Sequence, residues 1–223
     1  MNMPIPKPTL PKLSDASKMP CKSWSISAGD TCPGSKDFVT GEWVDACEIC
    51  YARGGFYLMP VVRAVREFNK KDWKRAEWEN DMVKLLSPME LFRWFDSGDM
   101  YHLGLAKKIR NVMARTPNTK HWLPTRQHKF DKFKGVLSEM EQLPNVIVRY
   151  SSDSISGGLV DGLNSSTIIP YVETPTTATV CLAYDRKGKC GDCRACWDKS
   201  IKVIAYPAHG RKAAKLIKLR EVA

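Results

Sequence analysis

The sequence predicts a single α/β domain, built as a partial (β/α) barrel or as an open parallel sheet. Three segments in the middle of the chain begin with a short apolar or aromatic run: LFRWFD (91–96), HWLPTR (121–126) and VIVRYSSD (146–153). The first two runs are each followed by apolar residues at helical spacing. Strand and helix patterns that alternate about every 25 to 30 residues are typical of right-handed βαβ units, whose strands run parallel.

Further strands are expected on both sides of these three units. KSWSISA (22–28) is the candidate first strand, IKVIAYPAH (201–209) is the candidate last one, and ATVCLAY (178–184) is a further candidate. The stretch between Ser154 and Thr179 is rich in Gly, Ser, Thr and Pro, so it is expected to be a long loop or an irregular insertion. About six strands suit an open or partial barrel better than a closed eight-stranded one, which takes about 250 residues. A doubly wound sheet is the alternative arrangement.

Helices are expected where apolar residues recur every three or four positions. The helices after the first two runs carry the following apolar residues: Leu105, Ile109, Val112 and Met113, then Phe133, Val136, Leu137, Met140 and Leu143. An earlier helix is expected between residues 60 and 86, with Val61, Val65 and Phe68 on one face. The basic C-terminal segment HGRKAAKLIKLREVA (209–223) is expected to form a short helix.

The chain is expected to divide into three parts. Residues 1–20, with four prolines among the first eleven residues, are predicted to form an extended arm. Residues 21–180 are predicted to form the α/β core with the first cysteine group, and residues 181–223 a cysteine-rich extension that completes the core and ends in the basic tail. No stretch approaches the roughly 18 consecutive apolar residues of a membrane span, and the proline-rich start lacks the apolar segment of a secretory signal. The protein is therefore expected in the cytoplasm, with no membrane partner.

The charge of the chain favours an anionic partner. It has 35 Lys and Arg residues against 24 Asp and Glu residues, a formal net charge of +11. A basic surface binds polyanions by releasing their counterions, so nucleic acid is a candidate partner, as are a host protein and an anionic small molecule. A basic protein without such a partner is the alternative, because charge alone carries no specificity.

Polar side chains follow each of the three middle strands. In parallel α/β proteins the ligand binds at the carboxyl ends of the strands, so these residues form a candidate pocket. They are Asp96, Ser97, Gly98 and Asp99 after the first run, Thr125 and Arg126 after the second, and Arg149, Ser151, Ser152 and Asp153 in the third. The alternative is that Ser-Gly-Asp and Ser-Ser-Asp are ordinary helix caps and turns.

Seven of the eight cysteines fall into two closely spaced groups. Cys32, Cys47 and Cys50 have the form C-x14-C-x2-C, and Cys181, Cys190, Cys193 and Cys196 have the form C-x8-C-x2-C-x2-C. In a reducing compartment such cysteines are more often metal ligands or redox groups than disulfides. Cys21 stands apart and is expected to be a buried or free thiol.

The spacing of the second group favours an iron–sulfur cluster over zinc, because zinc sites usually combine two separate cysteine pairs. Four cysteines would complete the coordination of a [4Fe–4S] cluster, whereas three would leave one iron open to another ligand. The sequence thus predicts one or two [4Fe–4S] clusters. The alternative is one zinc site formed by Cys47, Cys50, Cys193 and Cys196.

An ordered series of motifs resembles the phage protein family called gene product eighty-eight. The motifs are SKMPCKSWSISAGDTC, CEICYA, FRWFDSGDM, WLPTR, and CGDCRACW followed by AYPAH, and they extend from about Ser17 to His209. The resemblance implies a protein made in the cytoplasm of an infected bacterium, and it brings no established activity.

A more distant resemblance is to the radical S-adenosylmethionine proteins. Their cysteine triad is usually C-x3-C-x2-C, after the first strand, with an aromatic residue beside the last cysteine. Here the last gap is also two residues and Tyr51 adjoins Cys50, whereas the first gap is fourteen residues. The resemblance implies that S-adenosylmethionine binds the open iron and is cleaved reductively with an electron from a donor protein.

The same resemblance implies roles for five further residues. The backbone of Gly98 and the carboxylate of Asp99 would hold the methionine amino group, in the place of a Gly-Gly-Glu-like turn. Arg126, Ser151 and Asp153 would line the cofactor or substrate pocket. The predicted function is a phage-encoded iron–sulfur protein, with radical S-adenosylmethionine chemistry if it is an enzyme. The alternative is a non-catalytic iron–sulfur or zinc protein that binds nucleic acid or a host protein.

Overall fold

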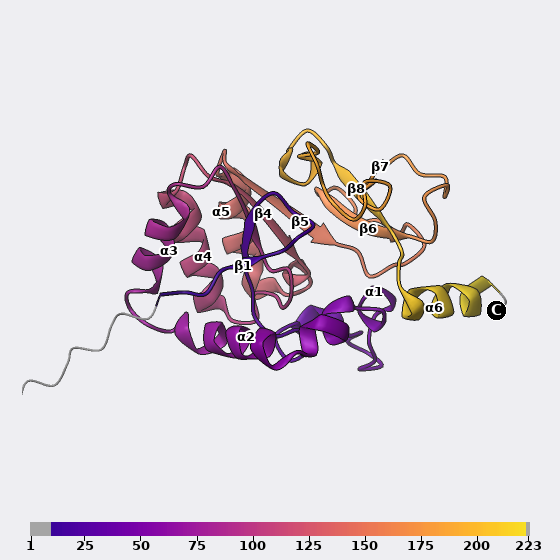
Figure 1. The fold of residues 1–223 in the computed structure, drawn as a ribbon, viewed down its shortest axis with the longest axis horizontal. Helices are drawn as coiled ribbons and strands as arrows, with labels where there is room; N and C mark the ends of the chain where they lie inside the picture. Colours follow the sequence, from indigo (N-terminus) through magenta and orange to yellow (C-terminus); the bar gives the residue numbers. More distant parts are fainter. Residues whose placement is uncertain (1–9, 222–223) are drawn as a thin grey trace, which may run out of the picture.

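A computed structural model describes residues 10–221, which form one sheet of eight strands and six α-helices (Figure 1). The strands are β1 (Ser14–Asp15), β2 (Lys22–Trp24), β3 (Leu91–Trp94), β4 (Lys120–Thr125), β5 (Val146–Ser151), β6 (Ser165–Ile169), β7 (Thr179–Val180) and β8 (Val203–Pro207). They lie in the order β1-β2-β3-β4-β5-β6-β8-β7. β1 pairs antiparallel with β2, and all other neighbouring strands are parallel.

The strand order decides between the two predicted architectures. From β2 to β6 each strand lies beside the strand that precedes it in the chain, and β8 follows next to β6. A doubly wound sheet reverses its order in the middle, whereas this sheet does not. The mostly parallel open sheet is therefore confirmed and the doubly wound alternative is wrong, whereas the partial barrel is not shown.

The predicted strands are present, but two of them are short. β3, β4 and β5 lie in the three repeated runs. β2 ends at Trp24 instead of continuing to residue 28, because the chain there turns toward a helix: the carbonyl of Ser25 accepts a hydrogen bond from the side chain of Asn69 (3.0 Å). Of the two C-terminal candidates, β8 is a full strand and β7 has two residues.

One expectation about an irregular segment is wrong, and the expected N-terminal arm is described only in part. The stretch 154–179 contains β6, which pairs with β5 and along its whole length with β8. Its sequence, SSTII, is short and starts with polar residues, so it resembles a loop, yet four of its five residues are buried. In the expected N-terminal arm, β1 pairs with β2, while residues 1–9 of the arm lie outside the described residues.

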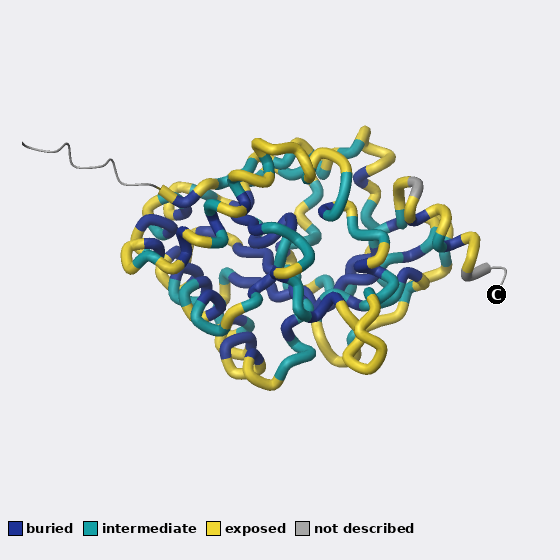
Figure 2. The backbone as a smooth tube through the Cα atoms, turned by 90° about the horizontal axis from the view of Figure 1, so that it is seen from below, coloured by how far each residue is buried: buried dark blue, intermediate teal, exposed yellow. Residues whose placement is uncertain are grey.

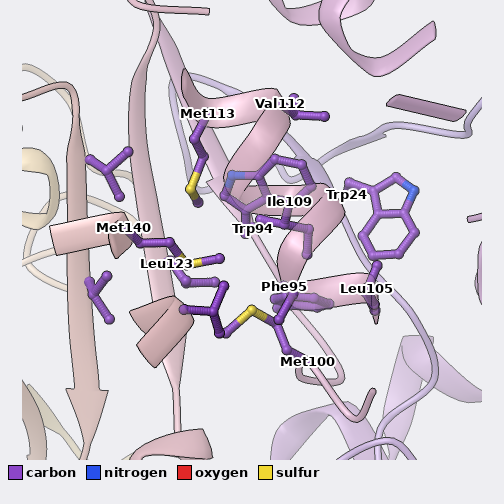
Figure 3. Close-up of a cluster of buried hydrophobic side chains, with 14 of the residues drawn as sticks. Trp24, Trp94, Phe95, Met100, Leu105, Ile109, Val112, Met113, Leu123 and Met140 are labelled. Carbon is purple, nitrogen blue, oxygen red and sulfur yellow. The ribbon is translucent and has the colours of Figure 1, made fainter. Parts of the chain in front are cut away.

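One face of the sheet is covered by helices α3 (Trp78–Leu86), α4 (Leu103–Arg115) and α5 (Asp131–Gln142), which lie together beside the strands in Figure 1. Leu105, Ile109, Val112 and Met113 of α4 are fully buried, as their spacing predicts. They pack against aromatic residues of the sheet such as Trp24 and Trp94, as Figure 3 shows. Burying each such side chain contributes about 1.5 to 3 kcal/mol, so this layer is the main core of the protein.

The helix expected between residues 60 and 86 is in fact two helices, α2 (Pro60–Asp72) and α3. Val61 is 66% exposed, and the buried residues of α2 are instead Arg66, Asn69 and Asp72. The apolar face predicted for this helix is therefore wrong. Arg75, in the turn after α2, pairs with Asp72 (2.6 Å) and also with an aspartate of α3, and so holds the two helices together.

The other face of the sheet is covered by the cysteine-rich C-terminal segment. A small second core forms there from Leu91, Trp122, Ile147 and Trp197. The indole of Trp197 donates a hydrogen bond to the carbonyl of Phe92 (3.0 Å), which fixes the segment onto β3. Figure 2 shows the result: buried backbone runs through the middle of the molecule and exposed backbone lies around it.

The basic C-terminal segment forms the expected helix, α6 (Arg211–Glu221). Ile217 is buried against Ala46 of α1 (Asp45–Glu48) and against Ile155, and α6 extends from the end of the sheet near α1 in Figure 1. Among residues 10–221, no helix combines the length and the apolar character needed to cross a bilayer.

Candidate functional site

A cavity of about 510 Å³ lies at the carboxyl ends of the parallel strands. Its walls include residues that end or follow β3, β4, β5 and β8, and the face of the sheet that the helices leave uncovered. Six cysteines from the two ends of the chain line it: Cys32, Cys47, Cys50, Cys181, Cys190 and Cys196. The parallel sheet thus brings the two cysteine groups to one place, although more than half of the chain separates them.

The first cysteine group comes from the long connection between β2 and α2. Cys47 lies in α1, and the amide of Ala46 donates a hydrogen bond to the carbonyl of Asp153 (2.9 Å), which fixes α1 to the end of β5. Burial is the main reason that the pKa of the Cys32 thiol is raised to about 12. Asp99, Cys47 and Cys50 also raise this pKa, and a hydrogen bond from the backbone of Gly29 lowers it. Burial also raises the pKa of Cys47.

The second group is held on the uncovered face of the sheet. The amide of Cys181 bonds to the carbonyl of Ala205 on β8, and that of Cys190 to the carbonyl of Lys18, each at 2.8 Å. The Cys196 sulfur lies 3.3 Å from the hydroxyl of Tyr206. Burial raises the pKa of Cys196 to about 11, although the Tyr206 hydrogen bond lowers it.

The remaining two cysteines also lie near this second group. Cys193 follows Cys190 in a turn, in which its amide bonds to the Cys190 carbonyl (3.1 Å), and it is not in the cavity wall. Cys21 packs beside the second core together with Cys196. Burial raises the pKa of Cys21 to about 12, and its electrostatic neighbours include Arg93 and Cys190.

All eight cysteines are free thiols in the structure. Within residues 10–221, no three His, Cys, Asp or Glu side chains are arranged so that they could hold a metal ion without rearranging. Burial raises the pKa values of Cys32, Cys47, Cys190 and Cys196, which favours the thiol over the thiolate, so a cation that binds them must displace their protons. The donor set, all sulfur and facing one cavity, fits a soft metal or an iron–sulfur cluster chemically, provided that the side chains converge.

The two groups remain separate from each other electrostatically. The thiol that perturbs the pKa of Cys47 is that of Cys50, and the thiol that perturbs the pKa of Cys196 is that of Cys181. The same holds for Cys32 and Cys190, whose pKa values are raised by thiols of their own groups.

Four of the five residues expected to hold S-adenosylmethionine also line this cavity: Gly98, Asp99, Arg126 and Ser151. Asp153 instead lines an adjacent cavity of about 310 Å³. There its carboxylate pairs with Arg126 (3.1 Å) and with Lys129. The predicted residues thus lie near one another at the carboxyl ends of the strands, and Asp153 lies in the adjacent cavity, paired with Arg126.

Asp99 is occupied by contacts within the protein. Its carboxylate accepts hydrogen bonds from the Thr125 hydroxyl (2.8 Å) and from the backbone amides of Arg126 (2.9 Å) and Met100 (2.7 Å). Burial raises the pKa of Asp99 and these donors lower it. The contacts tie the end of β3 to the end of β4, so in this structure Asp99 is a cross-link of the pocket wall.

Gly98 is required for steric reasons. Its φ of +78° lies in the left-handed region, and a Cβ atom there would come within 2.5 Å of Ile26 Cγ1 and 2.9 Å of Thr31 Oγ1. The close approach packs the turn after β3 against the loop that carries Cys32. The sequence motif Ser-Gly-Asp is therefore both a structural turn and part of the cavity wall.

The roles of three arginines around the site were not predicted from the sequence. Arg66 of α2 holds Asp96 through its guanidinium (3.1 and 3.2 Å) and Ser97 through Nε (2.6 Å). Arg149 was expected in the pocket, but it donates hydrogen bonds to backbone carbonyls between residues 195 and 201 and anchors the cysteine segment. Arg93 lines the cavity from β3. The available signal was a charged residue that alternates with Phe92 and Trp94 in an otherwise apolar strand.

Comparison with known proteins identifies the family. No curated protein and no solved structure matches the chain. One protein-family model, described as gene product 88, matches residues 6–199, which include both cysteine groups and every strand up to β7. Because the match covers most of the 223 residues, this chain belongs to the gene product 88 family.

Proposed function

We propose that this protein carries two iron–sulfur clusters, one in each of its cysteine groups. The observation that carries the proposal is the shared cavity, whose wall contains six free thiols from opposite ends of the chain. Free cysteines brought together at the carboxyl edge of a parallel sheet are in the place where such folds bind ligands. Cys193 would complete the second set with Cys181, Cys190 and Cys196, because it adjoins Cys190 in the same turn.

Iron–sulfur clusters explain this donor set better than zinc does. The second group offers three cysteines at two-residue gaps in one loop, which can wrap around a compact cluster. The first group offers three thiols and no fourth cysteine, which suits a cluster with one iron open to a small molecule.

S-adenosylmethionine is the small molecule that we propose for the open position. When bound, a cluster with three cysteine ligands supplies an electron and a coordination site for it. The cavity of about 510 Å³ falls within the roughly 300 to 1,000 Å³ typical of small-molecule sites. The role of this chain would be to hold the thiols, to shape the wall through the Gly98–Asp99 turn, and to bury the reacting groups away from water. The substrate and the electron donor would come from the infected cell.

The first experiment counts iron and sulfide in protein purified without oxygen. We expect about four irons and four sulfides per cysteine group. Changing Cys32, Cys47 and Cys50 together to Ser should remove about half of the iron, and changing the four C-terminal cysteines should remove the other half. Cys21→Ser is the matched control and should leave the iron content unchanged. A colourless protein with stoichiometric zinc after anaerobic reconstitution would disprove the proposal.

The second experiment tests catalysis separately from cluster binding. Protein with full clusters is incubated with S-adenosylmethionine and dithionite, and 5′-deoxyadenosine is measured. Its formation, and its loss in the Cys50→Ser variant, are the expected results. If no product forms while iron and sulfide are complete, the protein is a cluster-binding protein without this activity.

A binding function is the second candidate, and α6 favours it. Lys212, Lys215 and Lys218 are exposed on one side of this helix, while Ile217 holds the helix to the protein. Nucleic-acid binding that weakens steeply with salt, and that weakens further when the three lysines are changed to Gln, would support it. Absence of binding at about 50 mM salt would remove this candidate.

A further inference from the structure

Arg93 occupies an unusual position on the sheet. It lies on β3 between Phe92 and Trp94, which face the helices and are fully buried in the main core. Because side chains alternate along a strand, Arg93 faces the opposite side, where it lines the cavity. Its guanidinium lies over the ring of Trp122, 4.4 Å from the ring centre, which fixes its plane.

The guanidinium of Arg93 has few partners inside the protein. Its Nε is buried and has no hydrogen-bond partner, and Nη1 contacts only the sulfur of Met19 (3.3 Å), a weak acceptor. The hydroxyl of Tyr51, which also lines the cavity, donates its hydrogen bond to the carbonyl of Asp96 (2.8 Å). Within residues 10–221, no carboxylate lies within ion-pair distance of Arg93.

Two buried arginines, in contrast, have hydrogen-bond partners within the protein for their guanidinium groups. Arg66 has Asp96 and Ser97 as partners, and Arg149 has four backbone carbonyls. A buried charge without such partners is costly by several kcal/mol. Burial lowers the pKa of Arg93, but Tyr51 and Asp96 raise it and the net shift is upward, so the charge persists.

The acidic groups of the cavity wall are already committed elsewhere. Asp96 is held by Arg66, and Asp99 accepts hydrogen bonds from Thr125 and from two backbone amides. The positive charge of Arg93 therefore faces the cavity without a carboxylate to offset it directly.

Arg93 also lines the same cavity as both cysteine groups. It lowers the pKa of Cys196 electrostatically, although burial raises that pKa more. A molecule held by Arg93 would thus be within the part of the cavity that both groups face.

From these contacts we propose that Arg93 anchors an oxyanion, a carboxylate or a phosphate, of a small molecule bound in this cavity. The guanidinium of Arg93 carries the forked N–H donors that such anions accept in pairs, and the sulfur that Nη1 contacts is a weak acceptor that an anion could replace. The proposal concerns ligand binding by the polypeptide and holds whether or not the cysteines bind metal.

The test measures the thermal midpoint of the purified protein in sodium phosphate, in sodium succinate, and in sodium chloride at equal ionic strength. We expect phosphate or succinate to raise the midpoint above chloride with a saturable concentration dependence. In Arg93→Met the apparent affinity should fall about tenfold or more, because the paired donors are lost. Arg93→Lys, which keeps the charge without the fork, should be intermediate. Arg115→Met is the control, since Arg115 is exposed and bonds only to Asn80, and its response should equal that of the wild type.

A second measurement uses the unaltered protein, in case the Arg93 variants do not fold. Phenylglyoxal modification is followed peptide by peptide, and the stabilising anion should slow modification of Arg93 but not of Arg115. Stabilisation by phosphate points to a phosphorylated ligand, and stabilisation by succinate to a carboxylate ligand. The proposal is overturned if neither anion exceeds chloride or if Arg93→Met responds as the wild type does. It is also overturned if Arg93→Met loses iron while keeping the anion response, because Arg93 would then serve the metal centre.

Discussion

Replacing Arg149 by Met should release the cysteine-rich segment from the sheet. Arg149 has no exposed surface, and its guanidinium donates to the carbonyls of Cys196 (3.2 Å), Ile201 (2.9 Å), Ala195 (2.9 Å) and Asp198 (2.8 Å). Together these bonds hold the loop that carries the last cysteine against β5. Met fills a similar volume but donates no hydrogen bond, so the four carbonyls would lose their partner.

The magnitude follows from the number and kind of these bonds. A hydrogen bond to a charged group contributes about 1.5 to 3 kcal/mol, so four taken separately would give about 6 to 12 kcal/mol. The bonds share one donor group and are not additive, and carbonyls released to water recover part of the loss. We therefore expect a loss of about 3 to 5 kcal/mol, similar to breaking a buried ion pair. Since domains are stable by about 5 to 15 kcal/mol, this is enough to open the segment while the helical core stays folded.

The assay combines urea unfolding with alkylation of Cys196, measured by mass spectrometry. In the Arg149→Met variant, alkylation of Cys196 should be much faster than in the wild type, because its half-buried sulfur is otherwise held beside the Tyr206 hydroxyl. Arg110→Met is the control: Arg110 pairs with Glu139 on the surface (2.8 Å), and losing that pair costs about 1 kcal/mol at most. Unchanged alkylation together with a stability loss below about 1 kcal/mol would refute the role assigned to Arg149.

Two further predictions concern the pocket wall and the main core. Gly98→Ala should destabilise the protein by about 2 to 4 kcal/mol in urea unfolding, because it combines a left-handed φ with a Cβ contact of 2.5 Å to Ile26. The control is Gly135→Ala, whose Cβ meets no atom within 4 Å and which should be neutral or stabilising. Equal effects of the two substitutions would contradict the steric argument. Burial lowers the pKa of His121 to about 4 from its ordinary 6.5, so between these pH values the unfolded chain binds a proton that the folded protein does not. The free energy of unfolding should therefore fall as the pH drops from about 6.5 to about 4, by up to about 3 kcal/mol. Stability measured against pH should be flatter in His121→Gln over that range, and an identical slope would exclude His121 as the cause.

The elements that were predictable from sequence are those that pack in one dominant layer. The helices α4 and α5 bury the apolar side that their spacing indicates, because only one side of each helix meets the sheet. β3, β4 and β5 are recognisable because they lie in the middle of the sheet and are mostly apolar.

The elements that were not predictable depend on partners distant in the chain. β6 is a strand because β5 and β8 lie on either side of it, and its Ser and Thr residues are buried by that pairing rather than by their own character. α2 reverses the usual pattern, since the polar atoms of Arg66 and Asn69 find buried partners at the strand ends and the exposed Val61 does not need any. Local sequence contains no information about these partners.

The candidate site divides in the same way. The spacing within each cysteine group is visible in the sequence, whereas the meeting of the two groups requires the strand order that places β8 beside β6. The roles of Arg93 and Arg149 depend on which face of the sheet lacks helices, and that face is decided by the whole fold. For Asp99 the sequence predicted the position but not the contacts. Its place at a strand end was predicted, whereas its carboxylate oxygens accept hydrogen bonds from Thr125 and from backbone amides.

The face of the sheet that the helices do not cover also explains why ligand binding and folding stability should be linked in this protein. In parallel α/β folds both faces of the sheet are usually covered by apolar layers, and here the second layer is a segment without long helices, fixed by Trp197 and by the carbonyl contacts of Arg149. Such a layer buries little apolar surface of its own, so its order depends on polar anchors, and the thiols of Cys181, Cys190 and Cys196 lie beside it in the cavity wall. Any ligand that joins these thiols stabilises the folded layer and not the unfolded chain, and by mass action it raises the stability of the protein. The cysteine groups therefore lie beside the face of the sheet whose covering layer has the fewest other interactions to hold it in place.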